Sequence, residues 1–358
     1  MSTKFYPLRV HQLRRETADT ISIAFDLPES LRETFRFIPG QYLTLRTTID
    51  GEDIRRSYSI CSAPHENELR VAVKKIEGGI FGTYANERLQ VGDELLVMPP
   101  QGRFYAELRT DHAKTYVAFA AGSGITPVIS ILKSTLVQEP NSRFILFFGN
   151  RGFDHIVFRE QLDELKNRYP GQLAVHHVLS RESLGSPLLY GRLNGEKCRG
   201  YAKYFFTPEA VDHFFLCGPE EMIFEVKDTL TELGVPAEKI HFELFTTPGT
   251  PKKGPFKPSA GPRNSFDASV TVIQDGMQFD FTLPSDGSTL LDAAMRAGAD
   301  LPFSCKGGVC STCKARILEG NVEMEVNYGL EPDEVAAGYV LTCQSHPTSQ
   351  RLVISFDA

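Results

Sequence analysis

Four cysteines in the last sixth of the chain have the residue type and spacing to hold an iron–sulfur centre. Cys305, Cys310 and Cys313 follow one another as C-x4-C-x2-C, and Cys343 comes thirty residues later. This is the ligand spacing of a 2Fe–2S cluster held by four thiolates. Soft sulfur donors also match the metal in such clusters. We therefore predict Cys305, Cys310, Cys313 and Cys343 as metal ligands.

The alternatives for this segment are a zinc site or unrelated thiols. A structural zinc site usually has two C-x2-C pairs or a pair of histidines, whereas one C-x2-C occurs here and His346 is poorly spaced for zinc. Gly307 and Gly308 suit a loop that bends around a small cluster, because glycine adopts unusual backbone angles at low steric cost. The other cysteines, Cys61, Cys198 and Cys217, are each compatible with a small buried residue. Residues 268–358 resemble plant-type ferredoxins throughout.

A second chemical signal is the segment Arg56-Ser57-Tyr58-Ser59. A tyrosine ring can stack on an isoalloxazine, an arginine can pair with a flavin phosphate, and a serine hydroxyl can reach flavin N5. With Pro39–Tyr42 and Val73–Thr83, it resembles the flavin motifs of the ferredoxin–NADP+ reductase family, which implies FAD rather than FMN. The family usually has serine where this chain has Gly82, so Thr83 is the candidate hydroxyl. The resemblance assigns catalysis to Tyr58 and Ser59, and flavin contacts to Arg56, Ser57, Tyr58, Ser59, Val73, Lys74, Gly79, Phe81, Gly82 and Thr83.

A third signal is the turn Gly122–Pro127, which follows the apolar run Tyr116–Ala121. Glycines there would let the backbone approach a pyrophosphate at a helix N-terminus. The turn and the later segment Cys217–Met222 resemble the nicotinamide-nucleotide segments of the same family, and the resemblance places Cys217 beside the reacting nicotinamide carbon, as a catalytic residue. A tight turn and a buried strand cysteine are the alternatives. The predicted contacts are Gly122, Ser123, Gly124, Thr126, Pro127, Cys217, Gly218, Pro219 and Met222.

The choice between NADPH and NADH depends on residues near the adenosine. Arg181, beside Ser180, favours NADPH because arginine suits the 2′-phosphate, while the adjacent Glu182 leaves NADH possible. Asn150 and Arg151 match another family position near the adenosine. Either arginine is also compatible with a solvated loop.

The pattern of apolar residues predicts three modules. Residues 1–107 contain short alternating runs separated by turn signals, which indicates an antiparallel β-barrel. Residues 108–246 alternate apolar strands with helices, which indicates a doubly wound parallel α/β sheet. Residues 247–267 form a linker rich in proline, glycine and basic residues. Residues 268–358 are expected to form the ferredoxin domain, of α+β (β-grasp) class. The expected strands are Leu8–Leu13, Thr20–Leu27, Tyr42–Thr47, Arg56–Ile60, Leu69–Lys75, Glu94–Met98, Tyr116–Ala121, Phe144–Phe148, Leu173–Leu179, His213–Cys217, Ala268–Gln274 and Gln278–Leu283.

Composition narrows the class of protein. The chain has 358 residues and a net charge of −7, which argues against a nucleic-acid partner because phosphate binding requires clustered Lys and Arg. The N-terminus has no apolar signal-peptide core, and no apolar stretch is long enough to span a bilayer. We expect a cytoplasmic protein without a membrane partner.

The order of flavin barrel, nucleotide domain and ferredoxin is similar to that of the reductase components of multicomponent oxygenases, over essentially the whole chain. Segments 242–249, 324–328, 330–334 and 337–344 resemble the reductase subunits of phenylacetyl-CoA epoxidases. The resemblance implies hydride transfer from NAD(P)H to FAD, then single electrons through the cluster to a di-iron oxygenase of phenylacetate degradation. The alternatives are the reductase of another oxygenase, for example one acting on steroids or hydroxylating aromatic rings, and a redox-sensing flavin/iron–sulfur protein.

Acidic residues flank the cysteine segment and are candidates for a face that docks the oxygenase. An ordinary solvated surface is the alternative. The six residues are Glu319, Glu323, Glu325, Glu331, Asp333 and Glu334.

Overall fold

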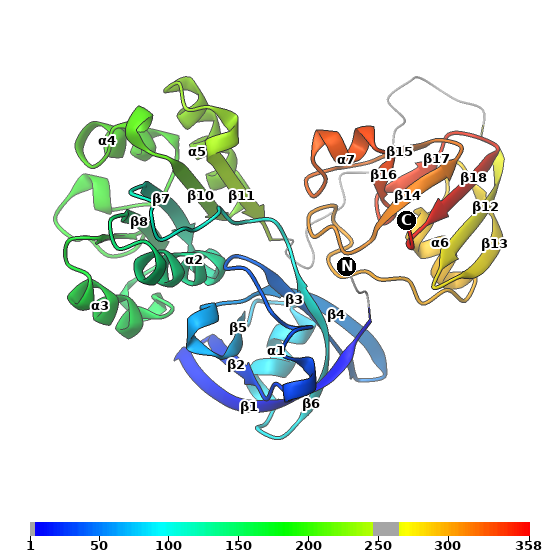
Figure 1. Ribbon diagram of the computed structural model, residues 1–358, viewed down its shortest axis with the longest axis horizontal. Helices are drawn as coiled ribbons and strands as arrows, with labels where there is room; N and C mark the ends of the chain where they lie inside the picture. The colour runs from blue at the N-terminus through cyan, green and yellow to red at the C-terminus, as the bar shows by residue number, and fades with distance from the viewer. Residues whose placement is uncertain (1–3, 246–264) are drawn as a thin grey trace. The chain divides into compact units, whose positions relative to one another are not determined.

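The structure is a computed structural model that describes residues 4–245 and 265–358 (Figure 1). The chain divides into two compact units, Met1–Phe245 and Thr246–Ala358. Of the predicted linker, residues 247–267, the part up to residue 264 lies outside the described residues. Within the described parts of the chain, no helix is both long enough and apolar enough to cross a membrane.

The first module of the larger unit is a six-stranded antiparallel sheet in the order β4-β3-β6-β1-β2-β5. An isolated antiparallel bridge between Ile60 and Val71 links the end of β4 to β5, so the sheet closes like a barrel. The helix α1 packs Phe81 and Ala85 into the barrel core. This confirms the predicted flavin-domain fold. The bounds are β1 Tyr6–Thr17, β2 Thr20–Phe25, β3 Tyr42–Ile49, β4 Glu52–Ser59, β5 Leu69–Lys74, β6 Glu94–Gln101 and α1 Ile80–Glu87.

The second module is a five-stranded parallel sheet in the order β11-β10-β7-β8-β9, with helices on both faces. Alternate residues of β7 face opposite cores: Tyr116 packs in the core that contains α2, and Val117 in the core that contains α4 and α5. This is the period-two pattern expected of a strand buried on both faces. The bounds are β7 Thr115–Ala121, α2 Ile125–Gln138, β8 Arg143–Asn150, α3 Arg159–Arg168, β9 Leu173–Leu179, α4 Gly195–Tyr204, β10 His213–Gly218, α5 Glu220–Glu232 and β11 Ile240–Leu244.

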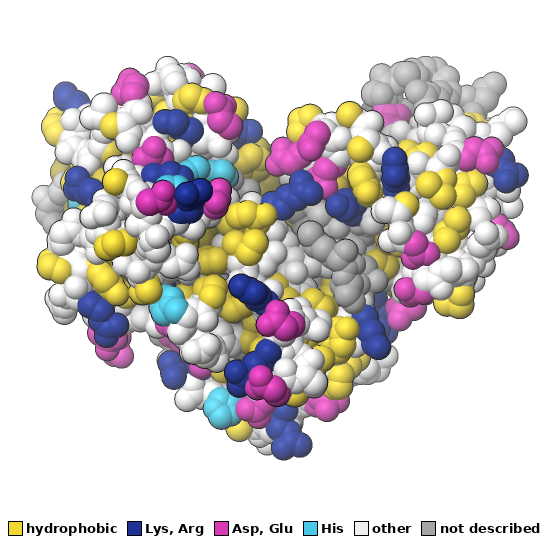
Figure 2. All heavy atoms as spheres, viewed as in Figure 1, with side chains coloured by type: hydrophobic (Ala, Val, Ile, Leu, Met, Phe, Trp, Pro, Cys, Tyr) yellow, Lys and Arg dark blue, Asp and Glu magenta, His cyan; other side chains and the backbone are white. Residues whose placement is uncertain are grey.

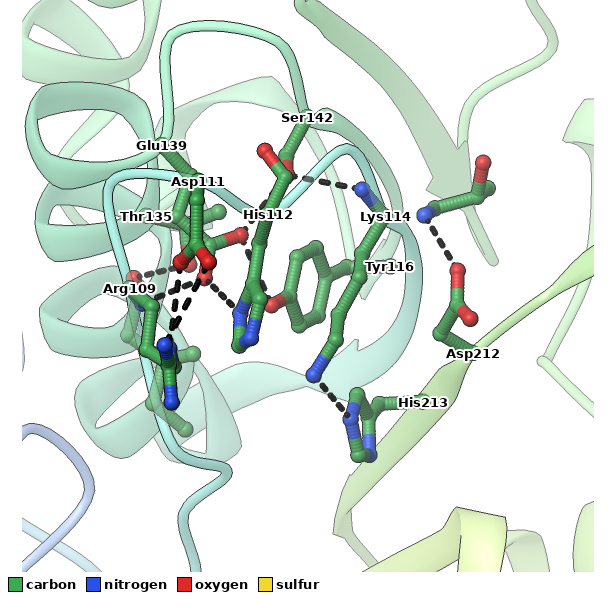
Figure 3. A network of polar contacts seen from close by, with 12 residues as sticks. Arg109, Asp111, His112, Lys114, Tyr116, Thr135, Glu139, Ser142, Asp212 and His213 are labelled. Carbon is green, nitrogen blue, oxygen red and sulfur yellow. Dashed lines mark hydrogen bonds and ion pairs between the residues drawn. The ribbon is translucent and has the colours of Figure 1, made fainter.

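A buried carboxylate fixes the chain segment that joins the two modules. The side chain of Glu139, at the C-terminal end of α2, is fully buried and accepts hydrogen bonds from the Arg109 backbone N–H (3.0 Å) and the Tyr116 hydroxyl (2.8 Å). It also contacts His112 Nδ1 at 2.8 Å and accepts from Ser142 Oγ at 2.7 Å (Figure 3). These hydrogen bonds outweigh the burial of Glu139 and lower its pKa. The connecting segment is therefore held against the sheet by one charge-assisted network.

Helix α2 also attaches the nucleotide module to the barrel. Ser130 Oγ donates to the Ser62 carbonyl oxygen at 2.6 Å, and the nearly buried Lys133 pairs with Glu66 at 2.7 Å. Phe104 packs in the same core as α2. The two modules consequently share apolar core and buried polar contacts, and they form one unit.

The smaller unit is a mixed sheet in the order β13-β12-β18-β14-β16, packed around α6. Strands β12 and β18 are parallel, and the neighbouring pairs are antiparallel. This confirms the predicted β-grasp class, and the expected strands Ala268–Gln274 and Gln278–Leu283 pair as the β12–β13 hairpin. The bounds are β12 Asp267–Gln274, β13 Met277–Pro284, α6 Leu290–Arg296, β14 Lys314–Glu319, β15 Val322–Met324, α7 Pro332–Ala336, β16 Tyr339–Leu341, β17 Ser345–Pro347 and β18 Arg351–Ser355.

Candidate functional site

The predicted flavin segment lies at the end of β4, where two adjacent arginines differ in their surroundings. Arg55 is buried and pairs with Asp53 at 2.9 Å. Arg56 is half-buried and donates to the Arg55 carbonyl oxygen at 2.7 Å, and no carboxylate pairs with it in residues 4–245 and 265–358. A guanidinium with its charge unneutralised suits a phosphate.

The segment after β5 has the shape expected of a diphosphate loop. Helix α1 begins after Gly79, and a Cβ atom on Gly82 would lie 2.7 Å from the Lys74 carbonyl oxygen. Glycine at position 82 therefore lets α1 pack against the end of β5, and the adjacent Thr83 is partly exposed. The side chain of Lys74 pairs with Asp19 at 3.3 Å.

Two of the predicted flavin contacts have side chains in the barrel core. Phe81 is 1% exposed, and its ring centroid lies 5.3 Å from that of Tyr58. Val73 is fully buried. These two residues can reach a cofactor through their backbone atoms, whereas the partly exposed Tyr58 and Ser57 can do so with their side chains.

The two predicted nucleotide segments touch one another. A Cβ atom on Gly124 would lie 2.0 Å from the Cys217 carbonyl oxygen and 2.8 Å from the Gly218 nitrogen, so only glycine allows this approach. Gly122 has a φ of +55°, and Thr126 Oγ1 donates to the Ser123 carbonyl oxygen at 3.0 Å.

Each of the two segments continues into a helix. Pro127 is buried in the first turn of α2, and Pro219 precedes α5. A Cβ atom on Gly218 would lie 2.8 Å from Met222 Cε. The carboxyl ends of β7 and β10 thus present backbone groups with little side-chain cover, as a pyrophosphate site requires.

A further contact between the two modules joins Ser59 of the barrel to Glu243 of the nucleotide module. Ser59 Oγ donates to Glu243 Oε2 at 3.1 Å, and Glu243 lies opposite Cys217 in the register of β10 and β11. Burial raises the pKa of Glu243 to about 7 and raises the pKa of Cys217 well above that of a free thiol. The arrangement offers a neutral thiol and a carboxyl group that can hold or release a proton near neutral pH.

Glu243 was not among the residues predicted from the sequence, although Ser59 and Cys217 were. It lies 184 positions after Ser59, and no motif in β11 distinguishes a catalytic carboxylate from a solvated one. Its partial burial beside Ser59 of the barrel is the signal, and this signal exists only in the folded chain.

The predicted adenosine-binding residues lie side by side at the ends of β8 and β9. Backbone N–H groups of Ser180 and Arg181 donate to the carbonyl oxygens of Asn150 and Arg151, each at 2.9 Å. Within residues 4–245 and 265–358, Asn150 Nδ2 is buried without a hydrogen-bond partner. A buried amide hydrogen that lacks a partner is costly, so a ligand atom at this edge would relieve that cost.

The adjacent acid is directed at the backbone of the β8 loop. Glu182 Oε2 accepts from the Phe153 N–H at 3.2 Å, and a Cβ atom on Gly152 would lie 2.1 Å from Glu182 Oε1. Arg151 and Arg181 are exposed, and neither has an ion-pair partner in the described parts of the chain.

The four predicted cluster ligands come together in the smaller unit as two pairs of thiols. The Cys310 thiol donates to Cys305 and lowers its pKa, and the Cys313 thiol donates to Cys343 with the same effect. In the two described ranges, no group of three or more His, Cys, Asp or Glu side chains is arranged to hold a single metal ion. Two pairs of thiols suit two irons, so the donor set fits a 2Fe–2S cluster.

The loop between the ligands directs N–H groups at sulfur. Gly307 N–H donates to Cys305 Sγ at 3.3 Å, and Cys305 N–H to Cys310 Sγ at 3.5 Å. Gly308 has a φ of +76°, as we expected, but Gly307 does not have a positive φ. Lys306 (+51°) and Ser311 (+53°) do so instead, so the bend is made partly by residues that prefer other conformations.

Comparison with known proteins gives the same three modules. The oxidoreductase FAD-binding domain family matches residues 7–105, the oxidoreductase NAD-binding domain family residues 119–228, and the 2Fe-2S iron-sulfur cluster binding domain family residues 272–348. The solved structure of phthalate dioxygenase reductase is similar in fold, with a TM-score of 0.58 at 23% identity, over 98% of each chain. The fold of an FAD-, NAD- and 2Fe–2S-binding oxidoreductase is thus confirmed.

Two relatives align along almost the whole chain. One of the subunits of 1,2-phenylacetyl-CoA epoxidase from Escherichia coli is 46% identical over 99% of both chains. The ferredoxin reductase component of 3-ketosteroid-9-alpha-monooxygenase from Rhodococcus rhodochrous is 35% identical over 98% of this chain and 96% of the relative. This chain therefore belongs to the family of oxygenase reductases that pass electrons from NAD(P)H through FAD and a 2Fe–2S cluster to an oxygenase, the family that includes both of these relatives.

Proposed function

We propose that this chain is the reductase subunit of a phenylacetyl-CoA epoxidase and that its partner is a di-iron oxygenase. The observation that carries the proposal is the 46% identity to the Escherichia coli epoxidase chain over 99% of both sequences. The steroid monooxygenase reductase has 35% identity and supports the alternative, another oxygenase. None of the seven cysteines, all of which lie in described residues, forms a disulfide, which supports a reducing, cytosolic location.

In this proposal the larger unit holds FAD and the nucleotide. A bound flavin accepts electrons in pairs and releases them singly, which matches a two-electron donor to a one-electron cluster. Arg56 binds the flavin diphosphate together with backbone N–H groups at the start of α1. Tyr58 packs against the flavin ring, and Ser59 orients its reacting edge.

Glu243 and Cys217 complete the proposed reaction site. Ser59 Oγ contacts Glu243 Oε2 at 3.1 Å, so this carboxyl group can deliver or remove a proton at the edge where Ser59 acts. Cys217 remains a thiol at neutral pH because burial raises its pKa. It therefore supplies an uncharged wall to the proposed nicotinamide site.

We propose NADPH as the preferred nucleotide. Arg151 and Arg181 are exposed and unpaired with acids in the described part of the chain, and their backbones are hydrogen-bonded at 2.9 Å. Two guanidinium groups at this edge suit a 2′-phosphate. Glu182, the acid that would favour a free ribose hydroxyl, is engaged with the Phe153 N–H.

The proposed docking face for the oxygenase is smaller than the six acidic residues suggest. Glu334 pairs with Lys314 at 3.0 Å, Glu325 contacts His346 at 2.7 Å and Glu319 pairs with Arg351 at 2.9 Å, and Glu323 also makes an interaction. Glu331 and Asp333 are exposed at the start of α7. On the face in Figure 2, acidic and basic side chains are intermixed, so a basic partner would be recognised by local groups such as these two rather than by net charge.

Anaerobic reduction tests the electron path and its acceptor together. NADPH should bleach the flavin and cluster absorption of the purified protein, at lower concentration than NADH, and electrons should then pass to the oxygenase of the epoxidase. Arg181→Ala should raise the KM for NADPH about tenfold and leave that for NADH unchanged, as expected for losing roughly 1.4 kcal/mol of a charge-assisted contact. Transfer to a steroid oxygenase and not to the epoxidase would refute the proposed partner.

The docking face has its own test at low salt. Asp333→Lys should slow transfer to the oxygenase and leave flavin reduction unchanged. Asp267→Lys is the control, because Asp267 is another exposed acid, on β12 of the same unit. Equal transfer rates in the two variants would exclude α7 from the docking face.

A further inference from the structure

The residue that follows the fourth cluster ligand has a buried side chain with several polar contacts. Gln344 is 3% exposed, and a buried amide must be hydrogen-bonded to avoid a large desolvation cost. Its Nε2 lies 2.9 Å from the Lys306 carbonyl oxygen, 2.9 Å from the Cys343 carbonyl oxygen and 3.6 Å from Cys343 Sγ. All three neighbours are acceptors, so the nitrogen, not the oxygen, of the amide points at them.

These contacts join two parts of the chain that carry different ligands. Lys306 belongs to the loop between Cys305 and Cys310 and has a φ of +51°, while Cys343 follows β16. The stem of Gln344 fills the space beside the same loop, since a Cβ atom on Gly308 would lie 3.2 Å from Gln344 Cγ. One side chain thus fixes a strained loop carbonyl, packs on the glycine and places an N–H near a ligand sulfur.

The backbone of Gln344 is fixed as well. Its N–H donates to the Leu341 carbonyl oxygen at 2.9 Å, and its carbonyl oxygen accepts from the Glu325 N–H at 2.8 Å. The side chain therefore projects from a rigid position, which is what a group needs to hold a donor at constant distance from a sulfur.

We propose that Gln344 is a positioning residue that sets the reduction potential of the cluster, by holding the Lys306 carbonyl and donating a hydrogen bond to Cys343 Sγ. Reduction adds one negative charge to a cluster and its thiolates, and N–H donors at the sulfurs stabilise that charge. Loss of the donor should make the cluster harder to reduce. The inference rests on the proposed ligand set.

The first test compares Gln344→Glu and Gln344→Leu in the full-length holoprotein. Iron content and the visible spectrum establish that the cluster is present, and a redox titration followed by the electron paramagnetic resonance of the reduced cluster gives its potential. Gln344→Glu places a carboxylate oxygen, a hydrogen-bond acceptor, opposite three acceptors. It should lower the equilibrium constant for reduction of the cluster about tenfold, which corresponds to a reduction potential about 59 mV lower. Gln344→Leu removes the donor without adding charge and should shift the potential less, in the same direction.

Gln350→Glu is the matched control, because Gln350 is an exposed glutamine of the same unit, six positions further along the chain. Its potential should equal that of the wild type. Potentials unchanged in both Gln344 variants, with full cluster content, would overturn the proposal. Absence of the cluster from the wild-type protein would instead refute the ligand set, so the two failures are distinguishable.

A second measurement needs no stable variant. Wild-type protein labelled with 15N in the glutamine side chains should show a nitrogen hyperfine coupling to the reduced cluster. Its absence would overturn the proposal even if the Gln344 variants lose their cluster. Gln350→Glu should retain the coupling, and any Gln344 variant that keeps its cluster should lack it.

Discussion

Replacing Gly124 by alanine should disable nucleotide oxidation while leaving the rest of the molecule intact. The new Cβ atom would lie 2.0 Å from the Cys217 carbonyl oxygen, where contacts below 3.0 Å are essentially never found. The two loops must therefore separate by about 1 Å, the difference between these distances. A misplacement of about 1 Å of groups that orient a substrate can lower a rate about 100-fold. Flavin reduction by NADPH should fall by about that factor.

Stopped-flow reduction under anaerobic conditions measures this rate, and dithionite shows that flavin and cluster are still bound. Gly171→Ala is the matched control, because Gly171 belongs to the same module and a Cβ atom there would have no neighbour within 4 Å. If the flavin of Gly124→Ala is reduced at a rate within threefold of that of the control, the reasoning is refuted. The close approach of the two loops would then not be needed for flavin reduction.

Three further changes test other parts of the structure. Glu243→Gln should remove an ionisation near pH 7 from the pH profile of flavin reduction. Because the pKa of Glu243 is raised, its ionisation lowers the stability of the folded protein as the pH rises from about 4.5 to 7. Chemical denaturation above pH 7 should therefore find the variant no less stable than the wild type. Glu139→Leu leaves the Tyr116 hydroxyl and other buried donors without an acceptor. Each unsatisfied buried donor costs about 1–3 kcal/mol, so the free energy of unfolding should fall by roughly 3 kcal/mol or more. Because the pKa of Glu139 is lowered, the wild-type advantage should shrink as the pH falls below about 4.5, and a thermal-unfolding series across pH measures this. Cys313→Ser should lose the cluster and keep the flavin, which metal analysis and the visible spectrum would show; a full iron content would remove Cys313 from the ligand set.

Much of the fold follows from local pattern. The strand Tyr116–Ala121 and its neighbours are apolar on both faces, and such runs alternating with amphipathic helices leave few arrangements other than a parallel sheet. The barrel strands were likewise identified from alternation and turn signals. Helix α4 and strand β11 were not predicted. Polar and apolar residues are mixed in α4, and β11 is a short edge strand that is partly exposed along most of its length. Neither segment therefore shows a clear periodicity of apolar residues.

The candidate cluster ligands could be proposed from the sequence because one short segment holds three of the four. The candidate reaction site could be proposed only in part. Ser59 and Cys217 belong to local motifs, whereas Glu243 acquires its raised pKa from partial burial where the two modules meet. The partners of Glu325 and Glu334 are tertiary contacts, which is why a count of acidic residues overstated the docking face.

The contacts of α2 with the barrel bear on how this enzyme can be re-engineered. Ser130 and Lys133 project from the nucleotide module, but their partners, Ser62 and Glu66, belong to the barrel. A chimera that exchanges the nucleotide module for one with another coenzyme preference would bury a lysine without its carboxylate unless both sides of this contact are transplanted. The boundary at Phe245 separates two compact units, so recombination of family members is expected to succeed there and to fail at the boundary near residue 107.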